Sequence, residues 1–162
     1  MFSRTLVATQ PNKKPSSQVK VLVSRVRILV ADDFSAWRVA ARKIVQMCPT
    51  WKVIAEAGDG LEAVQKATEL RPDVVLLDVG MPVLNGIEAA KRIKQTSPAS
   101  KIIFLTQDMD DEVRAAALAT GAEGYVVKAR AACDLQPAVK AALRDGSQPY
   151  APNSRPLAQI AR

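Results

Sequence analysis

The chain alternates between short, nearly continuous apolar runs and longer segments in which apolar residues recur every three or four positions. The short runs are rich in Val, Ile and Leu and too continuous for strands with one face in water, so they are typical of buried parallel strands. Alternation of such strands with amphipathic helices predicts an α/β protein with a five-stranded parallel sheet and helices on both faces. The strands are expected over residues 26–31, 51–57, 73–77, 101–105 and 124–127.

Capping and breaking residues mark the expected ends of the helices. The first helix is expected over residues 35–47 and the last over about 131–144. Three polar residues are each followed by an acid three positions later, which is typical of helix N-caps; they are Asp59, Asn85 and Asp108. The residues placed to end helices are Pro49, Pro72, Gly121 and the pair Asp145-Gly146.

The net charge of +7 comes entirely from the two ends of the chain. Residues 26–145, the expected domain, contain equal numbers of basic and acidic side chains. Residues 1–25 and 146–162 contain basic residues and no acids. We expect the first of these segments to be a disordered basic leader and the second a Pro-containing tail or truncated linker. A neutral core argues against a dedicated nucleic-acid binder.

Several classes of protein are disfavoured by composition. Histidine is absent, and Cys48 and Cys133 are isolated in the sequence, so a zinc site is not expected. Two unpaired thiols are typical of a reducing compartment. No apolar stretch is long enough to span a membrane, so we expect a cytoplasmic protein.

Polar residues follow four of the five expected strands. Asp32 and Asp33 come after the first strand, Asp78 after the third, Thr106 after the fourth and Lys128 after the fifth. The carboxyl ends of parallel strands meet at one edge of a sheet, which is where such folds bind ligands. We therefore expect these five side chains to converge.

The convergence of three carboxylates implies a divalent cation, because burying them together without one would be unfavourable. Mg²⁺ suits best, since it prefers oxygen ligands and is commonly held by carboxylates and phosphate oxygens. Asp78 would then be placed as a nucleophile toward phosphorus. Lys128 and the Thr106 hydroxyl would neutralise or bind two phosphoryl oxygens. The sequence thus predicts a magnesium-dependent phosphate-accepting site.

Four motifs in order resemble the receiver domain of bacterial two-component response regulators. They are Ile28-Leu29-Val30-Ala31-Asp32-Asp33, Val74 through Pro82 together with Gly86, Leu105-Thr106, and Gly124-Tyr125-Val126-Val127-Lys128. The resemblance covers residues 26–145 and implies the doubly wound, flavodoxin-like (CheY-like) fold with strand order 2-1-3-4-5. It implies a phosphoacceptor switch rather than an enzyme, with at most intrinsic self-phosphorylation and autodephosphorylation.

The resemblance also implies a role for each site residue. Asp78 would accept a phosphoryl group from a sensor histidine kinase or phosphotransfer protein, and Thr106 and Lys128 would read the phosphate. The acidic pair, Asp78 and the backbone carbonyl of Gly80 would bind magnesium. Tyr125 matches the switch aromatic of the family, although a half-buried strand aromatic is an equally good interpretation. The output would be a downstream protein or self-association through the face of the fourth helix, fifth strand and fifth helix.

One position departs from the common family pattern. Many relatives have proline after the lysine, where this chain has Ala129, and relatives with a LuxR-type DNA-binding domain often lack that proline too. Residues 119–130 resemble those relatives. The 17 residues from 146 to 162 are too few for a DNA-reading domain. The chain is therefore expected to be a stand-alone receiver or a truncated transcriptional regulator.

Three other functions remain possible on the same residues. An aspartyl-phosphate phosphatase of the haloacid dehalogenase type would want an acid at the position of Gly80. A flavin or nucleotide carrier would need a phosphate-binding loop after the first strand, where Asp32, Asp33 and Phe34 would repel phosphate unless a metal intervened. A nucleic-acid binder acting through its basic ends is disfavoured by the neutral core.

Overall fold

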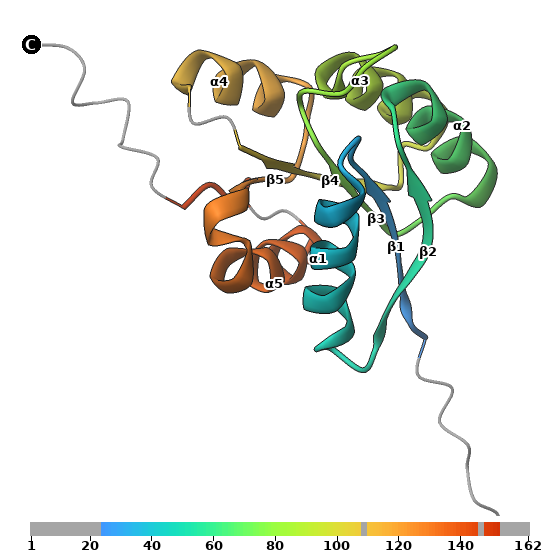
Figure 1. Cartoon of the computed structure of the whole chain (residues 1–162), viewed down its shortest axis with the longest axis vertical. Coiled ribbons are helices and arrows are strands. Elements are labelled where there is room, and N and C mark those ends of the chain that lie inside the picture. The colour runs from blue at the N-terminus through green and yellow to red at the C-terminus, as the bar shows by residue number, and fades with distance from the viewer. Residues whose placement is uncertain (1–23, 108–109, 146–147, 153–162) are drawn as a thin grey trace, which may run out of the picture.

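Five parallel strands form one sheet in the order β2-β1-β3-β4-β5 (Figure 1). The computed structural model describes residues 24–107, 110–145 and 148–152. The strands are β1 (Val26–Ala31), β2 (Trp51–Ala57), β3 (Val74–Leu77), β4 (Lys101–Thr106) and β5 (Gly124–Val127). The strand order and the parallel pairing are those expected from the sequence. β3 begins one residue later than expected, at Val74, and the Asp73 side chain before it accepts a 2.7 Å hydrogen bond from the Arg27 amide.

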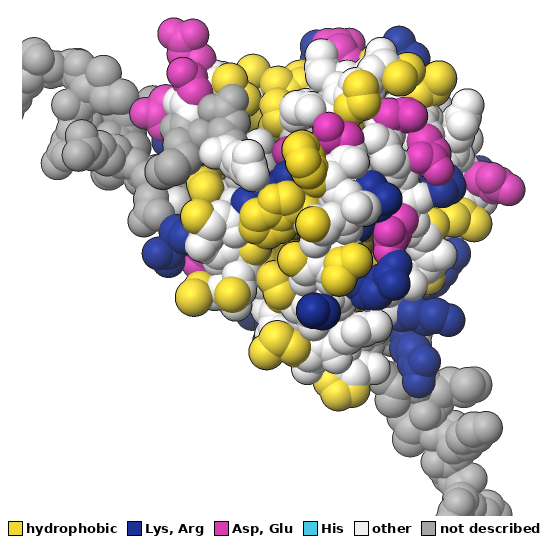
Figure 2. All heavy atoms as spheres, viewed as in Figure 1, with side chains coloured by type: hydrophobic (Ala, Val, Ile, Leu, Met, Phe, Trp, Pro, Cys, Tyr) yellow, Lys and Arg dark blue, Asp and Glu magenta, His cyan; other side chains and the backbone are white. Residues whose placement is uncertain are grey.

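Helices cover both faces of this sheet. The helices are α1 (Ser35–Gln46), α2 (Gly60–Leu70), α3 (Gly86–Thr96), α4 (Asp111–Ala119), α5 (Ala131–Ala142) and the short 3₁₀ helix η1 (Lys128–Arg130). Residues of α1 and α5 bury one apolar cluster, and those of α2, α3 and α4 bury the other. Figure 2 shows hydrophobic side chains over α1 and α5 on the outer surface as well. No helix in the described part of the chain has the length and apolar character needed to span a bilayer.

Two of the three predicted N-caps are confirmed and one is wrong. The side chains of Asp59 and Asn85 accept hydrogen bonds of 2.8 and 2.9 Å from the amides three residues ahead. The N-cap of α4 is Asp110 rather than Asp108, which lies outside the described residues. The Asp110 carboxylate accepts bonds of 2.7 and 3.2 Å from the amides of Glu112 and Val113. Asp108 has an acid three positions later and Asp110 does not, so the sequence favours Asp108, whereas the bonds to the first-turn amides identify Asp110 as the cap.

The predicted helix ends are correct to within two residues. α1 ends at Gln46 and α5 at Ala142, slightly before the expected 47 and 144. Beyond α4, Gly121 has φ of 88°, a left-handed conformation that ends a helix and that glycine adopts without steric cost.

The two ends of the chain were expected to be a leader and a tail. Residues 1–23 and 153–162 lie outside the described residues. Tyr150, however, lies against the sheet, where it forms an isolated parallel bridge with Gly124 of β5. At least this residue of the expected tail therefore belongs to the folded domain.

Candidate functional site

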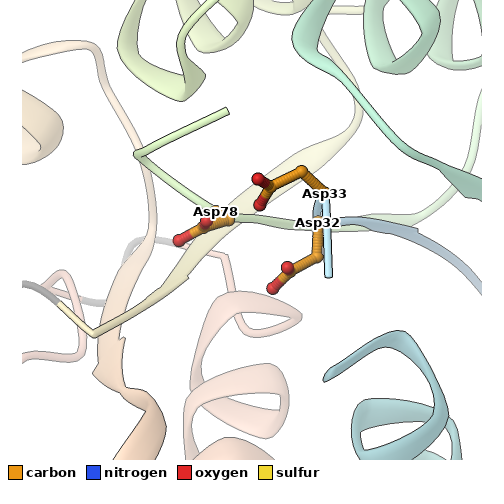
Figure 3. Close-up of side chains that lie close together, drawn as sticks. All are labelled: Asp32, Asp33 and Asp78. Carbon is orange, nitrogen blue, oxygen red and sulfur yellow. The ribbon is translucent and has the colours of Figure 1, made fainter. Parts of the chain in front are cut away.

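Three carboxylates converge at the carboxyl end of the sheet (Figure 3). Asp32 and Asp33 follow β1, and Asp78 follows β3, which is its neighbour in the sheet. One oxygen of each carboxylate lies within 4.8 Å of one oxygen of each of the others. Asp32 and Asp78 are buried, whereas Asp33 is exposed. The predicted acidic cluster therefore exists, with its open side at Asp33.

Backbone hydrogen bonds hold the two buried acids in place. The Asp32 amide donates to the Ala57 carbonyl of β2 at 3.0 Å, and the Asp78 amide donates to the Ala31 carbonyl of β1 at 2.9 Å. The guanidinium of Arg38 donates to the Asp32 carbonyl at 2.7 Å. The two bonds between backbone groups continue the hydrogen bonding of the sheet by one residue beyond β1 and β3. The strands therefore determine where the backbone of Asp32 and Asp78 lies.

The loop after Asp78 folds back closely against that residue. The Gly86 amide donates to the Val79 carbonyl at 2.8 Å. A Cβ atom at position 86 would lie 1.9 Å from the Asp78 carbonyl oxygen, closer than atoms can approach. Gly80, in contrast, has open space around it. Gly86 is thus required by the packing of the site, and Gly80 is not.

Lys128 supplies the positive charge of the site. Its ammonium lies 2.6 Å from Asp32 Oδ2 and 3.6 Å from Asp78 Oδ2, and all three side chains are buried. The same ammonium lies 5.1 Å from the centre of the Trp37 ring, a cation–π distance. No cis peptide occurs among the described residues, so the bond between Lys128 and Ala129 is trans. Lys128 is held by two acids and an aromatic ring.

Burial raises the pKa of the Asp78 carboxyl above its ordinary value. The nearby Lys128 ammonium counteracts this effect, while the charges of Asp32 and Asp33 add to it. The protein's own cation therefore does not fully offset the cost of an ionised Asp78. An additional cation at this place would be favourable.

A pocket of about 220 Å³ opens over these groups. It is lined by Asp33, Phe34, Asp78, Val79, Gly80, Thr106, Gln107 and Lys128. Thr106 is the last residue of β4 and is buried, rather than following the strand as expected. Tyr125 does not line this pocket. Its ring is buried and lies 6.5 Å from the ring of Phe104, measured between centroids.

Four residues of the site were missed by sequence reasoning. Phe34 and Gln107 line the pocket, Trp37 contacts Lys128, and Arg38 binds the Asp32 backbone. Arg38 also pairs with Glu56 of β2 at 3.0 Å. The sequence offered one indication of their role. Phe34, Trp37 and Arg38 lie in or beside the first turn of α1, and Gln107 directly follows Thr106. The sequence could not show which way these side chains point.

The residues present fit a divalent metal ion. The donors are carboxylate oxygens, which Mg²⁺ prefers, and one of them belongs to the exposed Asp33 and is accessible from solvent. The raised pKa of Asp78 gives a second, electrostatic reason for a cation. The uncompensated negative charge at Asp78 and the carboxylate donors both favour a divalent cation at this site.

Comparison with known proteins supports the family resemblance seen in the sequence. Residues 28–140 match the family model of the response regulator receiver domain. Over 103 residues the chain is 41% identical to the transcriptional regulatory protein LnrK of Bacillus subtilis, covering 64% of this chain and 47% of LnrK. The chain spans about half the length of the curated transcriptional regulators it matches.

Solved structures agree in fold. The response regulator domain of Thermotoga maritima CheB superposes with a TM-score of 0.68 at 33% identity, covering 73% of this chain and 96% of that domain. The isolated receiver domain of RcsB from Salmonella enterica serovar Typhimurium, determined with the phosphomimetic BeF₃⁻, gives a TM-score of 0.70 at 28% identity. That match covers 76% of this chain and 91% of the RcsB domain. With its sheet order, its acidic cluster and its family match, the chain belongs to the receiver domains of two-component response regulators.

Proposed function

We propose that this chain is a phosphoacceptor switch in which Asp78 takes a phosphoryl group from the phosphohistidine of a sensor kinase or phosphotransfer protein. An oxygen of the Asp78 carboxylate attacks phosphorus, the O–P bond forms, and the N–P bond to the donor imidazole breaks. The imidazole keeps the electron pair and takes a proton from solvent. No general base is needed, because the attacking group reacts as a carboxylate.

The other site residues are proposed to bind and orient the phosphoryl group. Asp32, Asp33, Asp78 and the Gly80 carbonyl would hold Mg²⁺, which when bound supplies positive charge that offsets the carboxylates and the phosphoryl oxygens. Lys128, whose ammonium is already 3.6 Å from Asp78, would bind one phosphoryl oxygen. Thr106 lines the same pocket and would bind another.

The proposal rests above all on one observation. Three carboxylates from two neighbouring strands meet within 4.8 Å beside a buried lysine, and the pocket above them is open. A purely structural ion pair would not need an open pocket lined by Asp78, Thr106 and Lys128. A phosphatase is less well supported, because the position two residues after Asp78 is Gly80 rather than an acid.

The proposed function has consequences outside the site. A receiver acts as a switch rather than a turnover enzyme, so we expect at most slow self-phosphorylation from small donors and slow autodephosphorylation. We expect a cytoplasmic protein whose output is a downstream partner or self-association. The face formed by α4, β5 and α5 is the proposed output surface, because β5 leads directly into Lys128.

Intact mass measurement tests this function directly. The chain is incubated with acetyl phosphate and Mg²⁺, with Asp78→Asn as the matched variant and chelator in place of the metal as a second control. We expect one added phosphate that requires both Asp78 and Mg²⁺. Labelling of Asp78→Asn to the same extent would show that the acceptor lies elsewhere.

A further inference from the structure

The outer edge of β5 is occupied by a residue from the C-terminal segment. β5 is the last strand of the sheet, so one side of its backbone has no strand neighbour. The Tyr150 amide donates to the Glu123 carbonyl at 2.9 Å, and the Tyr125 amide donates to the Tyr150 carbonyl at 2.8 Å. Figure 1 shows this short red segment close to β5. Tyr150 therefore extends the sheet by one residue in parallel orientation.

The side chain of Tyr150 is anchored as well. It packs against the apolar cluster of α1 and α5, and the Asp134 carboxylate lies near enough to its hydroxyl to influence the pKa of that group. Asp134 is only 6% exposed and accepts a 2.8 Å bond from the guanidinium of Arg130. Burial and, after it, the negative charge of Asp134 raise the pKa of the Tyr150 hydroxyl, and the positive charge of Arg130 partly counteracts them. We refer to the contacts of Tyr150 with Glu123, Tyr125 and Asp134 as the Tyr150 latch.

The latch and the phosphoacceptor site share two short segments. Tyr125 of β5 donates to Tyr150 and lies three residues before Lys128. η1 carries Lys128 at its first position and Arg130, which binds Asp134, at its third. Because η1 is only three residues long, we expect a displacement of the backbone at Lys128 to reach Arg130. A shift of Lys128 toward Asp78, from the present 3.6 Å, would therefore move Arg130.

We propose that the Tyr150 latch is an intramolecular cover of the β5 edge which phosphorylation of Asp78 releases. The phosphate-free arrangement, with Lys128 closer to Asp32 than to Asp78, coexists with a closed latch. Drawing Lys128 onto a phosphoryl group would pull η1 away from the geometry that the latch requires. Release uncovers the Tyr125 amide and the Glu123 carbonyl on the proposed output face.

Linkage makes this coupling reciprocal. If phosphorylation weakens the latch, then weakening the latch must favour the phosphorylated state by the same factor. The release step rests on the proposed function of Asp78, whereas the existence of the latch does not.

Amide exchange in the absence of a phosphodonor tests the latch by itself. The full chain is labelled with ¹⁵N, and the exchange rate of the Tyr125 amide is compared in wild type, Tyr150→Phe, Tyr150→Ala and Tyr150→Pro. We expect exchange to accelerate on the order of tenfold in Tyr150→Ala and more in Tyr150→Pro, which loses the backbone donor. Tyr150→Phe loses only the hydroxyl and should show a smaller effect. Gln148→Ala, in the same segment, should match wild type.

The outcome that overturns the latch is equal Tyr125 exchange in all five proteins. A global loss of stability would instead accelerate amides throughout the sheet, including those of β1 and β3. Faster exchange that is confined to the β5 edge therefore indicates release of the latch, whereas faster exchange throughout the sheet indicates unfolding.

Exchange after phosphorylation tests the coupling. With acetyl phosphate and Mg²⁺, we expect the Tyr125 and Tyr150 amides of wild type to exchange several-fold faster, and those of Asp78→Asn to be unchanged. Unchanged or slower exchange in protein whose mass shows full labelling would overturn the release step while leaving the proposed function intact. Absence of any label at Asp78 would overturn the proposed function and the coupling together, and the latch would still be judged from the rates without phosphodonor.

Discussion

The ammonium of Lys128 lies 5.1 Å from the centre of the Trp37 ring, so an aromatic side chain of α1 faces the charged centre of the site. The chain contains one other tryptophan, Trp51 in β2, which is only 9% exposed. The fluorescence of Trp37 should therefore be sensitive to changes at the carboxylates. Trp51 should contribute a constant fluorescence signal.

We expect the fluorescence of Trp37 to change when Mg²⁺ is added. A cation bound between the carboxylates competes with Lys128 for Asp32 and shifts the ammonium relative to the ring. The change should saturate with Mg²⁺, persist in Trp51→Phe and disappear in Trp37→Phe. A response carried by Trp51 instead would show that the ring of Trp37 does not sense the site.

Replacement of Asp78 by Asn should stabilise the metal-free protein at neutral pH. The pKa of Asp78 is raised in the folded state, mainly by burial, so the folded protein binds more protons than the unfolded chain just above the ordinary carboxyl pKa. The stability contributed by Asp78 is therefore lost as pH rises through the folded pKa. Each kcal/mol gained should raise the melting temperature by roughly 2–4 °C.

Thermal melts of wild type and Asp78→Asn across pH measure this effect. The difference should be largest near pH 7 and should shrink as the pH falls below the ordinary value of 3.8, where Asp78 becomes protonated in both states. Added Mg²⁺ should narrow it at neutral pH by stabilising wild type more than the variant. If Asp78→Asn were less stable than wild type without metal, burial of the ionised Asp78 carboxylate would not be the cost that we assign to it.

Two glycines close to the acceptor should differ in how strongly replacement by alanine destabilises the protein. In Gly86→Ala the new Cβ would lie 1.9 Å from the Asp78 carbonyl, so the loop must move. We expect a loss of about 1–3 kcal/mol in the free energy of unfolding and weakened Mg²⁺ binding. Gly80→Ala has open space and should change unfolding by about 0.5 kcal/mol or less. Denaturant melts and metal titration of the pair distinguish local crowding from a general effect of the added methyl group.

Removal of the Lys128 charge should strengthen Mg²⁺ binding but abolish the response of the protein to phosphorylation. In Lys128→Ala the carboxylates lose a cation 2.6 Å away, so we expect Mg²⁺ to bind about tenfold more tightly or better. The response of the Tyr125 amide to phosphorylation should be lost, because nothing draws η1 toward the phosphate. Lys128→Arg keeps the charge and should retain wild-type metal affinity. Weaker Mg²⁺ binding in Lys128→Ala would show that the lysine does not compete with the metal.

The sequence by itself was sufficient for the architecture. Short apolar runs rich in β-branched residues favour buried strands, and their alternation with amphipathic helices predicts a parallel sheet. The observed strand order agrees with the one that the family resemblance implies. The convergence of Asp32, Asp78 and Lys128 follows, because the carboxyl ends of all parallel strands lie at the same edge of the sheet. The chemical roles of these residues stay predictions until labelling tests them.

Tertiary structure decided the features that depend on side-chain direction and on contacts between distant segments. Sequence periodicity could place Trp37 and Arg38 in the first turn of α1 but could not show that they face the site. It assigned the α4 cap to Asp108, whereas hydrogen-bond geometry selects Asp110. It also treated Tyr150 as part of a tail, because one residue adding to a strand edge leaves no periodic pattern. Its place at β5 depends on an open backbone edge and a buried Asp134 that only the folded sheet brings together.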